Sequence, residues 1–252
     1  MQLGELLEGV ARRNGALRRG EAEREIAAVA YDSRKVAPGA VFVAIRGEHA
    51  DGNRFVGDAL SRGATAVVSE EARPAEGAAL NVPPDVAWVQ VEEPRQALAR
   101  IAANFHGRPA EALELVGITG TNGKTTTSFL VDSILRAAGH GTGLFGTIVY
   151  RTPKGETPAK HTTPESLELQ KFFAQVRAEG GTHVSMEVSS HALALDRVWG
   201  CRFAATIFTN LTRDHLDFHK TMEAYGAAKR RLFEGTGAGA PRVGLWPGGK
   251  PE

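Results

Sequence analysis

The stretch that decides the fold is Gly117-Ile118-Thr119-Gly120-Thr121-Asn122-Gly123-Lys124-Thr125-Thr126-Thr127. It continues an apolar run, residues 113–118, that predicts a strand, and it opens a helical pattern over residues 125–138. Glycines let a loop turn its backbone N–H groups toward phosphate oxygens, and the dipole of the next helix adds positive charge. In such a loop Lys124 is placed to reach the β- and γ-phosphates of a nucleotide, and the Thr125 hydroxyl is placed to bind Mg²⁺.

The loop departs from the strict P-loop pattern at one position. That pattern has a glycine five residues before Gly123, where this chain has Ile118. A tight strand-to-helix turn without a ligand is therefore the alternative interpretation. The Gly-Lys-Thr sequence between a strand and a helix favours phosphate binding. The residues that we assign to it are Thr119, Gly120, Thr121, Asn122, Gly123, Lys124, Thr125 and Thr126.

Strands and helices alternate after this loop. The patterns predict strands at residues 143–147, 183–188 and 204–209, a hairpin through Lys154-Gly155, and helices after Pro164 and over residues 221–233. Such alternation is typical of a mostly parallel sheet with helices on both faces. From Gly235 onward the chain is rich in glycine and proline without a periodic pattern, so we expect no regular structure there.

The first half of the chain shows the same alternation on a smaller scale. A helix is predicted from Leu3 to Val10, strands at residues 26–31, 41–45, 65–69 and 86–91, and helices at residues 55–62 and 94–103. The pattern breaks around His106-Gly107-Arg108-Pro109. We therefore predict an α/β protein with a small N-terminal domain, residues 1–108, and a P-loop mononucleotide-binding domain with a mostly parallel sheet, residues 109–252.

Composition excludes several classes of function. The formal net charge of +1 gives no general attraction for nucleic acid, and no stretch approaches the roughly 20 apolar residues that cross a bilayer. Cys201 is the single cysteine, which excludes an intramolecular disulfide and a cysteine-built zinc site. We expect a cytoplasmic protein that neither binds nucleic acid nor inserts into a membrane, and we take it to be a monomer.

Two further strands end in residues that suit a nucleotide–metal site. Glu187 comes late in the strand at residues 183–188, where an unpaired carboxylate would be costly to bury, and a capped strand end is the alternative. His215 follows the strand at residues 204–209 and is a second candidate ligand, although a lone histidine is more often structural. By pattern alone Lys229 would be a solvated lysine on the last helix.

Taken in order, these motifs resemble the Mur ligases, which build the stem peptide of peptidoglycan. The resemblance rests on the glycine loop, on Glu187-Val188-Ser189-Ser190-His191 and on Asp214-His215-Leu216-Asp217. Tyr31-Asp32-Ser33-Arg34 and Gly47-Glu48-His49-Ala50-Asp51-Gly52 resemble the domain that binds a UDP-muramoyl precursor in the members that add the third amino acid. Thr162-Thr163-Pro164-Glu165 and the segment from Ser189 to Arg197 resemble contacts to the muramoyl dipeptide, and the resemblance covers residues 1 to about 234.

The resemblance implies roles for individual residues. Lys124, Glu187, His215 and Lys229 would be catalytic, with Thr125, Glu187, His215 and Lys229 binding metal, two Mg²⁺ in all. Lys229 resembles the carbamylated lysine of the family, whose carbamate would be an anionic oxygen ligand. The precursor-binding residues would be Tyr31, Ser33, Glu48, His49, Ala50, Thr162, Thr163, Ser189 and Arg197, while Leu195 stands where some members have glutamine.

The resemblance also implies a reaction. ATP would phosphorylate the D-glutamate carboxylate of UDP-N-acetylmuramoyl-L-alanyl-D-glutamate, and the amine of a diamino acid would attack the acyl phosphate. Mur ligases have three domains, so we expect that the central domain is incomplete here, that the C-terminal domain is absent and that this chain alone binds precursor but ligates poorly. The residues present do not separate lysine, diaminopimelate and ornithine as the incoming amino acid.

Two alternatives remain open at this point. Another carboxylate–amine ligase with the same ATP domain, such as a folylpolyglutamate or cyanophycin synthetase, would share the glycine loop but not the N-terminal motifs. A non-catalytic nucleotide-binding module would use ATP or the UDP-sugar as a structural ligand. Binding tests with the muramoyl precursor and with folates would separate the two ligase interpretations.

Overall fold

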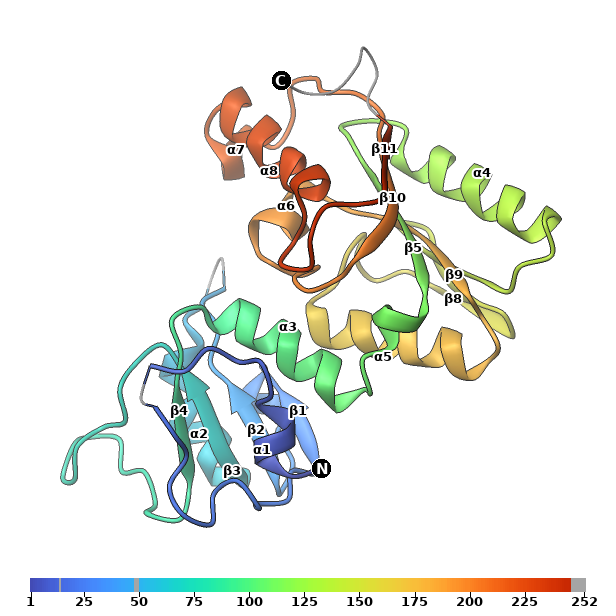
Figure 1. Ribbon diagram of the computed structural model, residues 1–252. Coiled ribbons are helices and arrows are strands. Elements are labelled where there is room, and N and C mark those ends of the chain that lie inside the picture. The colour runs from blue at the N-terminus through green and yellow to red at the C-terminus, as the bar shows by residue number, and fades with distance from the viewer. Residues whose placement is uncertain (14, 48–49, 246–252) are drawn as a thin grey trace. The chain divides into compact units, whose positions relative to one another are not determined.

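The computed structural model describes residues 1–13, 15–47 and 50–245. The chain divides into two compact units, Met1–Phe105 and His106–Glu252, which we describe one at a time. Figure 1 shows the elements of both. The assignment of separate functions to residues 1–108 and 109–252 stays a prediction.

Unit 1 is a four-stranded parallel sheet with helices on its two faces. Its strands are in sequence order, β1-β2-β3-β4, and every neighbouring pair is parallel. The elements are α1 (Leu3–Leu6), β1 (Ala28–Ala30), η1 (Ser33–Lys35), β2 (Ala40–Val43), η2 (Gly52–Phe55), α2 (Val56–Ser61), β3 (Ala64–Ser69), β4 (Ala87–Gln90) and α3 (Pro94–Phe105). The predicted strands and helices of this half all occur, and the loop at Asp32-Ser33-Arg34 forms a short 3₁₀ turn.

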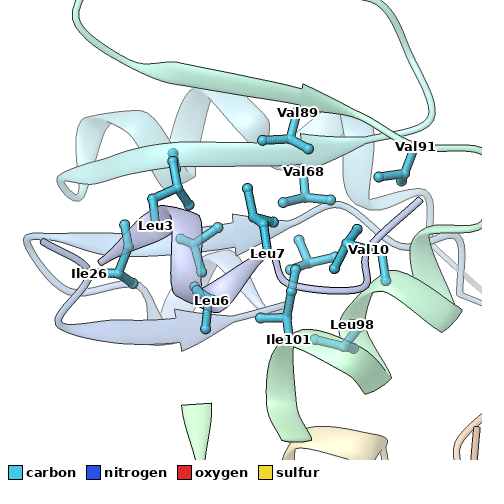
Figure 2. Close-up of a cluster of buried hydrophobic side chains, with 14 of the residues drawn as sticks. Leu3, Leu6, Leu7, Val10, Ile26, Val68, Val89, Val91, Leu98 and Ile101 are labelled. Carbon is cyan, nitrogen blue, oxygen red and sulfur yellow. The ribbon is translucent and has the colours of Figure 1, made fainter. Parts of the chain in front are cut away.

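Alternate residues of these strands face two separate cores, since successive side chains of a strand point to opposite faces. Val41 and Val43 belong to the cluster under α1 and α3, whereas Phe42 belongs to the cluster under α2. Figure 2 shows the first cluster, to which α1, β3, β4 and α3 contribute. Its labelled side chains are Leu3, Leu6, Leu7, Val10, Ile26, Val68, Val89, Val91, Leu98 and Ile101. Burial on both faces explains why the strands read as continuous apolar runs.

Unit 2 is built around a seven-stranded sheet of order β11-β10-β5-β9-β6-β7-β8. Its elements are η3 (Pro109–Ala112), β5 (Glu114–Thr119), α4 (Lys124–Ala137), β6 (Thr142–Phe145), β7 (Val149–Thr152), β8 (Gly155–Pro158), α5 (Ser166–Ala178), β9 (His183–Glu187), α6 (Ser190–Ala194), β10 (Phe203–Phe208), α7 (Leu216–His219), α8 (Met222–Glu234) and β11 (Val243–Leu245). The strands from β11 to β6 are parallel, and β6, β7 and β8 are antiparallel. This confirms the predicted α/β class with mostly parallel sheets.

The strand order determines where the polar side chains of unit 2 meet. Central β5 pairs with β9 on one side and with β10 on the other. The register sets Ile118 beside Glu187 and Thr119 beside Phe208, so the carboxyl ends of the three strands lie at one edge. Ligands of open parallel sheets bind at such an edge, where neighbouring connections leave in different directions.

The prediction of no regular structure from Gly235 onward was wrong for residues 243–245, which form the strand β11, and the irregular segment before them is anchored by Thr236. Thr236 is 3% exposed, and its hydroxyl donates to the carbonyl oxygens of Val198 (3.0 Å) and Cys201 (3.2 Å). β11 then pairs in parallel with β10. Both contacts join residues far apart in sequence, so a local pattern rich in glycine does not reveal them. Residues 246–252 lie outside the described residues.

Within the described part of the chain, no helix combines the length and the apolar character that crossing a membrane requires.

Candidate functional site

The glycine loop after β5 has a conformation that only glycine adopts easily at two positions. Gly120 has φ of 143° and Gly123, the residue before α4, has φ of 85°. A Cβ on Gly120 would also lie 3.0 Å from the backbone nitrogen of Asn210. The loop therefore closes tightly on the segment after β10, and backbone N–H groups at the start of α4 are left facing outward.

Lys124 folds back over this loop. Its Nζ donates to the carbonyl oxygens of Gly120 (2.9 Å) and Thr121 (2.8 Å). Burial lowers the pKa of Lys124, while the charges of Glu187 and Asp214 act in the opposite direction. A partly desolvated ammonium held at a phosphate loop is the group expected to contact the phosphates of a nucleotide.

Lys229 on α8 reaches the same carbonyl from the other end of the unit's sequence. Its side chain is 1% exposed, and its Nζ donates to the Gly120 oxygen at 2.8 Å. Burial, assisted by the positive charge of Lys124, lowers the pKa of Lys229 from 10.5 to about 7, and the charge of Asp214 opposes the shift. The expectation of a solvated helix lysine, taken from pattern alone, is therefore wrong. A large part of this amine is unprotonated near neutral pH.

Glu187 at the end of β9 is bound by three donors. Its carboxylate accepts from the Thr125 hydroxyl (3.0 Å), the Thr147 backbone N–H (2.8 Å) and the Thr147 hydroxyl (3.1 Å). The side chain is 1% exposed. A hydroxyl oxygen and a carboxylate oxygen this close together can serve as two ligands of one Mg²⁺. In such sites Mg²⁺ is bound by one or two carboxylates together with phosphate oxygens.

The segment after β10 holds the loop from outside. Asn122 donates its backbone N–H to the Asn210 side chain (3.0 Å), and its carbonyl accepts from the Thr209 hydroxyl (2.6 Å) and the Asn210 amide (3.0 Å). The Thr121 hydroxyl accepts from the Thr212 backbone N–H (3.0 Å) and lies 3.2 Å from the Tyr225 hydroxyl. These bonds hold the backbone of the loop against the segment after β10 without a ligand, so its geometry is formed in advance.

His215 lies beyond this segment in a group of three histidines around Tyr225. Its ring centroid is 4.8 Å from that of His191 and 6.0 Å from that of Tyr225, and its Nε2 is 3.6 Å from an oxygen of Asp214. His219 is buried, and its Nε2 has no hydrogen-bond partner in the described part of the chain. Among the described residues, no three His, Cys, Asp or Glu side chains are arranged to hold a metal ion. The structure joins Thr125 to Glu187 and Lys124 to Lys229, but it brings His215 into direct contact with neither pair.

The unit 2 residues predicted to bind the precursor gather beside Glu187. The Thr163 hydroxyl donates to the Glu187 carbonyl (2.9 Å) and accepts from the Ser189 N–H (3.2 Å), and the Thr163 carbonyl accepts from Arg197 (2.9 Å). The Thr162 hydroxyl lies 3.1 Å from that of Thr147. Ser189 caps α6 by accepting from the Ala192 N–H. Through Glu187 these residues connect to Thr125, so they form one continuous edge with two of the four metal-binding candidates.

The unit 1 candidates follow β1 and β2. Ser33 is 6% exposed, and a hydrogen bond from its hydroxyl is the main cause that lowers the pKa of Asp58. Tyr31 is half-buried, with the Lys35 Nζ 5.8 Å from its ring centroid. Ala50 is exposed. Glu48 and His49 lie outside the described residues.

The sequence-based interpretation missed Thr147 and Tyr225. Thr147 follows β6, the neighbour of β9, so the rule that identified Glu187 at a strand's carboxyl end could also have found it. Tyr225 carries no motif signal. It contacts the site because α8 places it next to the loop, with the Lys229 Nζ 4.4 Å from its ring centroid.

This geometry defines a class of α/β protein with two units. In the second unit, a glycine loop of the phosphate-binding type and a carboxylate lie at the carboxyl ends of adjacent parallel strands. The Mur ligase middle domain matches residues 118–243, half of the chain, and the catalytic domain of the Mur ligase family matches residues 25–106. The chain therefore belongs to the Mur ligase family.

Individual relatives show which members of the family this chain resembles. The chain is 54% identical over 247 residues to the UDP-N-acetylmuramoyl-L-alanyl-D-glutamate--2,6-diaminopimelate ligase of Solibacter usitatus, covering 97% of this chain and 48% of that protein. It is 48% identical over 215 residues to the ligase of the same name from Geobacter sulfurreducens, covering 85% of this chain and 41% of the relative. This chain thus spans about half the length of the curated relatives that it matches.

Solved structures agree with the fold. A structure of UDP-N-acetylmuramoyl-L-alanyl-D-glutamate--2,6-diaminopimelate ligase matches with a TM-score of 0.71 at 29% identity, covering 93% of this chain and 45% of the other. MurF ligase from Thermotoga maritima in complex with ADP matches with a TM-score of 0.51 at 22% identity, covering 84% of this chain and 43% of that one. The second likeness concerns the fold alone.

Proposed function

We propose that this chain supplies the precursor-binding and ATP-binding parts of a MurE-type ligase. Its reaction is the ATP-dependent addition of a diamino acid to UDP-N-acetylmuramoyl-L-alanyl-D-glutamate. The relatives' names support 2,6-diaminopimelate as that amino acid. Residues 1–108 bind the UDP-muramoyl part and residues 109–252 bind ATP. We also propose that the protein is a monomer and that it is cytoplasmic. A single, buried cysteine fits the reducing conditions of the cytoplasm.

The observation that carries the proposal is that two lysines and a carboxylate lie near the carboxyl ends of adjacent strands in one sheet. Lys124 and Lys229 share the Gly120 oxygen, and Glu187 is bound to Thr125 at the start of α4. Phosphoryl transfer requires positioning and charge neutralisation more than covalent chemistry from the protein. When phosphates enter the loop, Lys124 exchanges its two carbonyl partners for phosphate oxygens, and the N–H groups of the loop are already in place.

Thr125 and Glu187 would hold one Mg²⁺, and His215 and a carbamate on Lys229 would hold a second. Bound Mg²⁺ neutralises charge that develops on the transferred phosphoryl group. Lys229 suits carbamylation because an amine attacks CO₂ only when unprotonated, and burial holds its pKa at about 7. Neither arginine nor an exposed lysine would give such an amine at neutral pH.

The remaining unit 2 residues orient the acceptor carboxylate. Thr162, Thr163, Ser189 and Arg197 lie on the same edge as Glu187, so a precursor bound there would present its D-glutamate carboxylate to the γ-phosphate. Transfer of the phosphoryl group gives an acyl phosphate and ADP. Attack by the amine of diaminopimelate then forms the amide and releases phosphate. Holding the reacting groups in line accounts for most of the benefit of such a site.

Calorimetric titration of the 252-residue chain with UDP-N-acetylmuramoyl-L-alanyl-D-glutamate tests the proposal. We expect micromolar binding, about −8 kcal/mol, weakened about tenfold by Ser33→Ala. Ser61→Ala is the matched control. The Ser61 hydroxyl also bonds to Asp58, by donating to its backbone oxygen, but Ser61 is not one of the proposed precursor-binding residues. Binding of a folate in preference to the muramoyl precursor, or no binding by the folded chain, would contradict the assignment.

A further inference from the structure

Two protein groups hold the guanidinium of Arg197. Its Nε donates to the Glu165 carboxylate at 3.0 Å, and its Nη1 donates to the Thr163 carbonyl at 2.9 Å. The side chains of Arg197 and Glu165 are 24% and 14% exposed. A free arginine side chain has many rotamers, and two bonds of this kind at a partly buried position select one of them.

The third nitrogen of the guanidinium, Nη2, makes neither of these bonds. The Nη2 group of Arg197 forms no hydrogen bond with any described residue, and it is not among the buried polar atoms without a partner. It is therefore accessible. The N–H groups of Nη2 can therefore donate to a carboxylate oxygen of a ligand.

Thr163 connects the guanidinium of Arg197 to the phosphate-transfer site. Its side chain is 2% exposed and bonds to both the Glu187 carbonyl and the Ser189 N–H, while its own carbonyl accepts from Arg197. The arginine is thus joined through one buried residue to the carboxyl end of β9, where Glu187 meets Thr125.

We propose that Glu165 is a positioning residue that aims Arg197 at the D-glutamyl carboxylate of the precursor, an inference that rests on the proposed function. Glu165 carries the same charge as that carboxylate. By charge alone its removal would strengthen binding of the anionic ligand, since repulsion is lost. By positioning, removal weakens binding, since Arg197 is released into other rotamers. The two explanations therefore differ in sign.

The experiment is a calorimetric titration of the whole 252-residue chain with two ligands. One is UDP-N-acetylmuramoyl-L-alanyl-D-glutamate, and the other is UDP-N-acetylmuramoyl-L-alanine, which lacks the D-glutamyl group. The variants are Glu165→Ala, Glu165→Gln and the control Glu156→Gln, whose carboxylate also accepts from an arginine Nε (Arg151, 3.1 Å) but is 56% exposed on β8.

We expect Glu165→Ala to weaken binding of the D-glutamyl ligand about tenfold and to change binding of the shorter ligand by less than about twofold. Glu165→Gln restores most of the affinity, because its amide oxygen still accepts from the Arg197 Nε. Glu156→Gln binds both ligands like the parent chain.

Two results for Glu165→Ala overturn the inference, and the binding behaviour of the parent chain shows whether the proposed function fails as well. Unchanged or tighter binding of the D-glutamyl ligand by Glu165→Ala shows that positioning is not its role. Equal losses for both ligands indicate a general structural defect, which circular dichroism and a melting curve would also reveal. If the parent chain binds the precursor in a Ser33-dependent manner while Glu165 variants do not matter, only this inference fails; if the parent chain binds neither ligand, the proposed function fails with it.

Discussion

The two units place charge at the carboxyl ends of their sheets in opposite ways. In unit 1 the charged groups pair with one another near solvent, as in the pairs Arg34–Asp32 (2.8 Å) and Arg62–Asp58 (3.0 Å). In unit 2 the two lysines of the loop donate to backbone carbonyls, and one of them is almost fully buried.

This difference shows where each unit tolerates electrostatic cost. The charges of an exposed ion pair stay solvated in the folded state. Such a pair therefore changes the free energy of unfolding little in either direction. Buried cations without a carboxylate partner in contact are expensive, and they persist where the rest of the fold holds them. Perturbed pKa values gather at functional sites for this reason, which supports the loop of unit 2 as the centre of the chemistry.

The largest expected effect comes from adding one carbon to the loop. In Gly120→Ala the new Cβ meets the Thr209 hydroxyl and the backbone of Asn210, at a φ that alanine rarely adopts. We expect a loss of about 3 kcal/mol or more in the free energy of unfolding and loss of ATP binding. Denaturant titration and calorimetry measure both. Gly155→Ala is the control, since nothing lies within 4 Å of its Cβ position; equal effects at the two sites would contradict the argument.

The second prediction concerns the buried lysine. The native pKa of Lys229 is about 7 and the unfolded value is 10.5, so between these values the unfolded state binds the extra proton and stability rises with pH. Relative to Lys229→Met, the unfolding free energy of the parent chain should rise by about 1.4 kcal/mol per pH unit in that window. Below it the variant should be the more stable protein.

Urea titrations of both proteins in CO₂-free buffer from about pH 6 to about pH 9 measure this slope. Parallel pH dependences would show that Lys229 titrates normally in the folded chain.

The smallest expected effect lies in unit 1. Arg34→Ala removes an arginine that is 80% exposed and raises the pKa of Asp32 toward its usual range, because the side-chain bond from Arg34 is the main cause of its lowering. The free energy of unfolding should stay close to that of the parent chain, because an exposed ion pair contributes little to stability. A larger loss in thermal or urea unfolding would mean that the two edges do not differ as described.

Local patterns contained most of the fold. Alternating apolar runs and helical spacing identified the strands β1 to β5, and the Gly-Lys-Thr sequence placed the loop between β5 and α4, because these signals come from residues adjacent in the chain. The burial of Lys229 could not be found this way. It depends on α8 packing against a loop 109 positions earlier, and an Ala-Ala-Lys segment looks the same on a solvated helix. The short strand β11 was hidden for the same reason.

The motifs named residues of the candidate site, whose roles stay predictions, but they did not reveal the contacts between those residues. The motifs pointed to Glu187, Thr163 and Arg197, and the structure brings these residues to one edge. The bond from Thr147 to Glu187 follows from the pairing of β6 with β9, and the bond from Arg197 to Glu165 joins two loops 32 positions apart. That information is carried by the tertiary fold and by no single motif.

The strand orders of the two sheets have a consequence for how the chain folds. In unit 1 each strand pairs with the next one along the chain, so every pairing closes a short loop. In unit 2 the central strand β5 pairs with β9 and β10, which follow 69 and 89 residues later by the registers of Ile118 with Glu187 and of Thr119 with Phe208. Since folding slows as contacts become less local, unit 1 should acquire its structure first, and the glycine loop should be among the last parts of the molecule to become ordered.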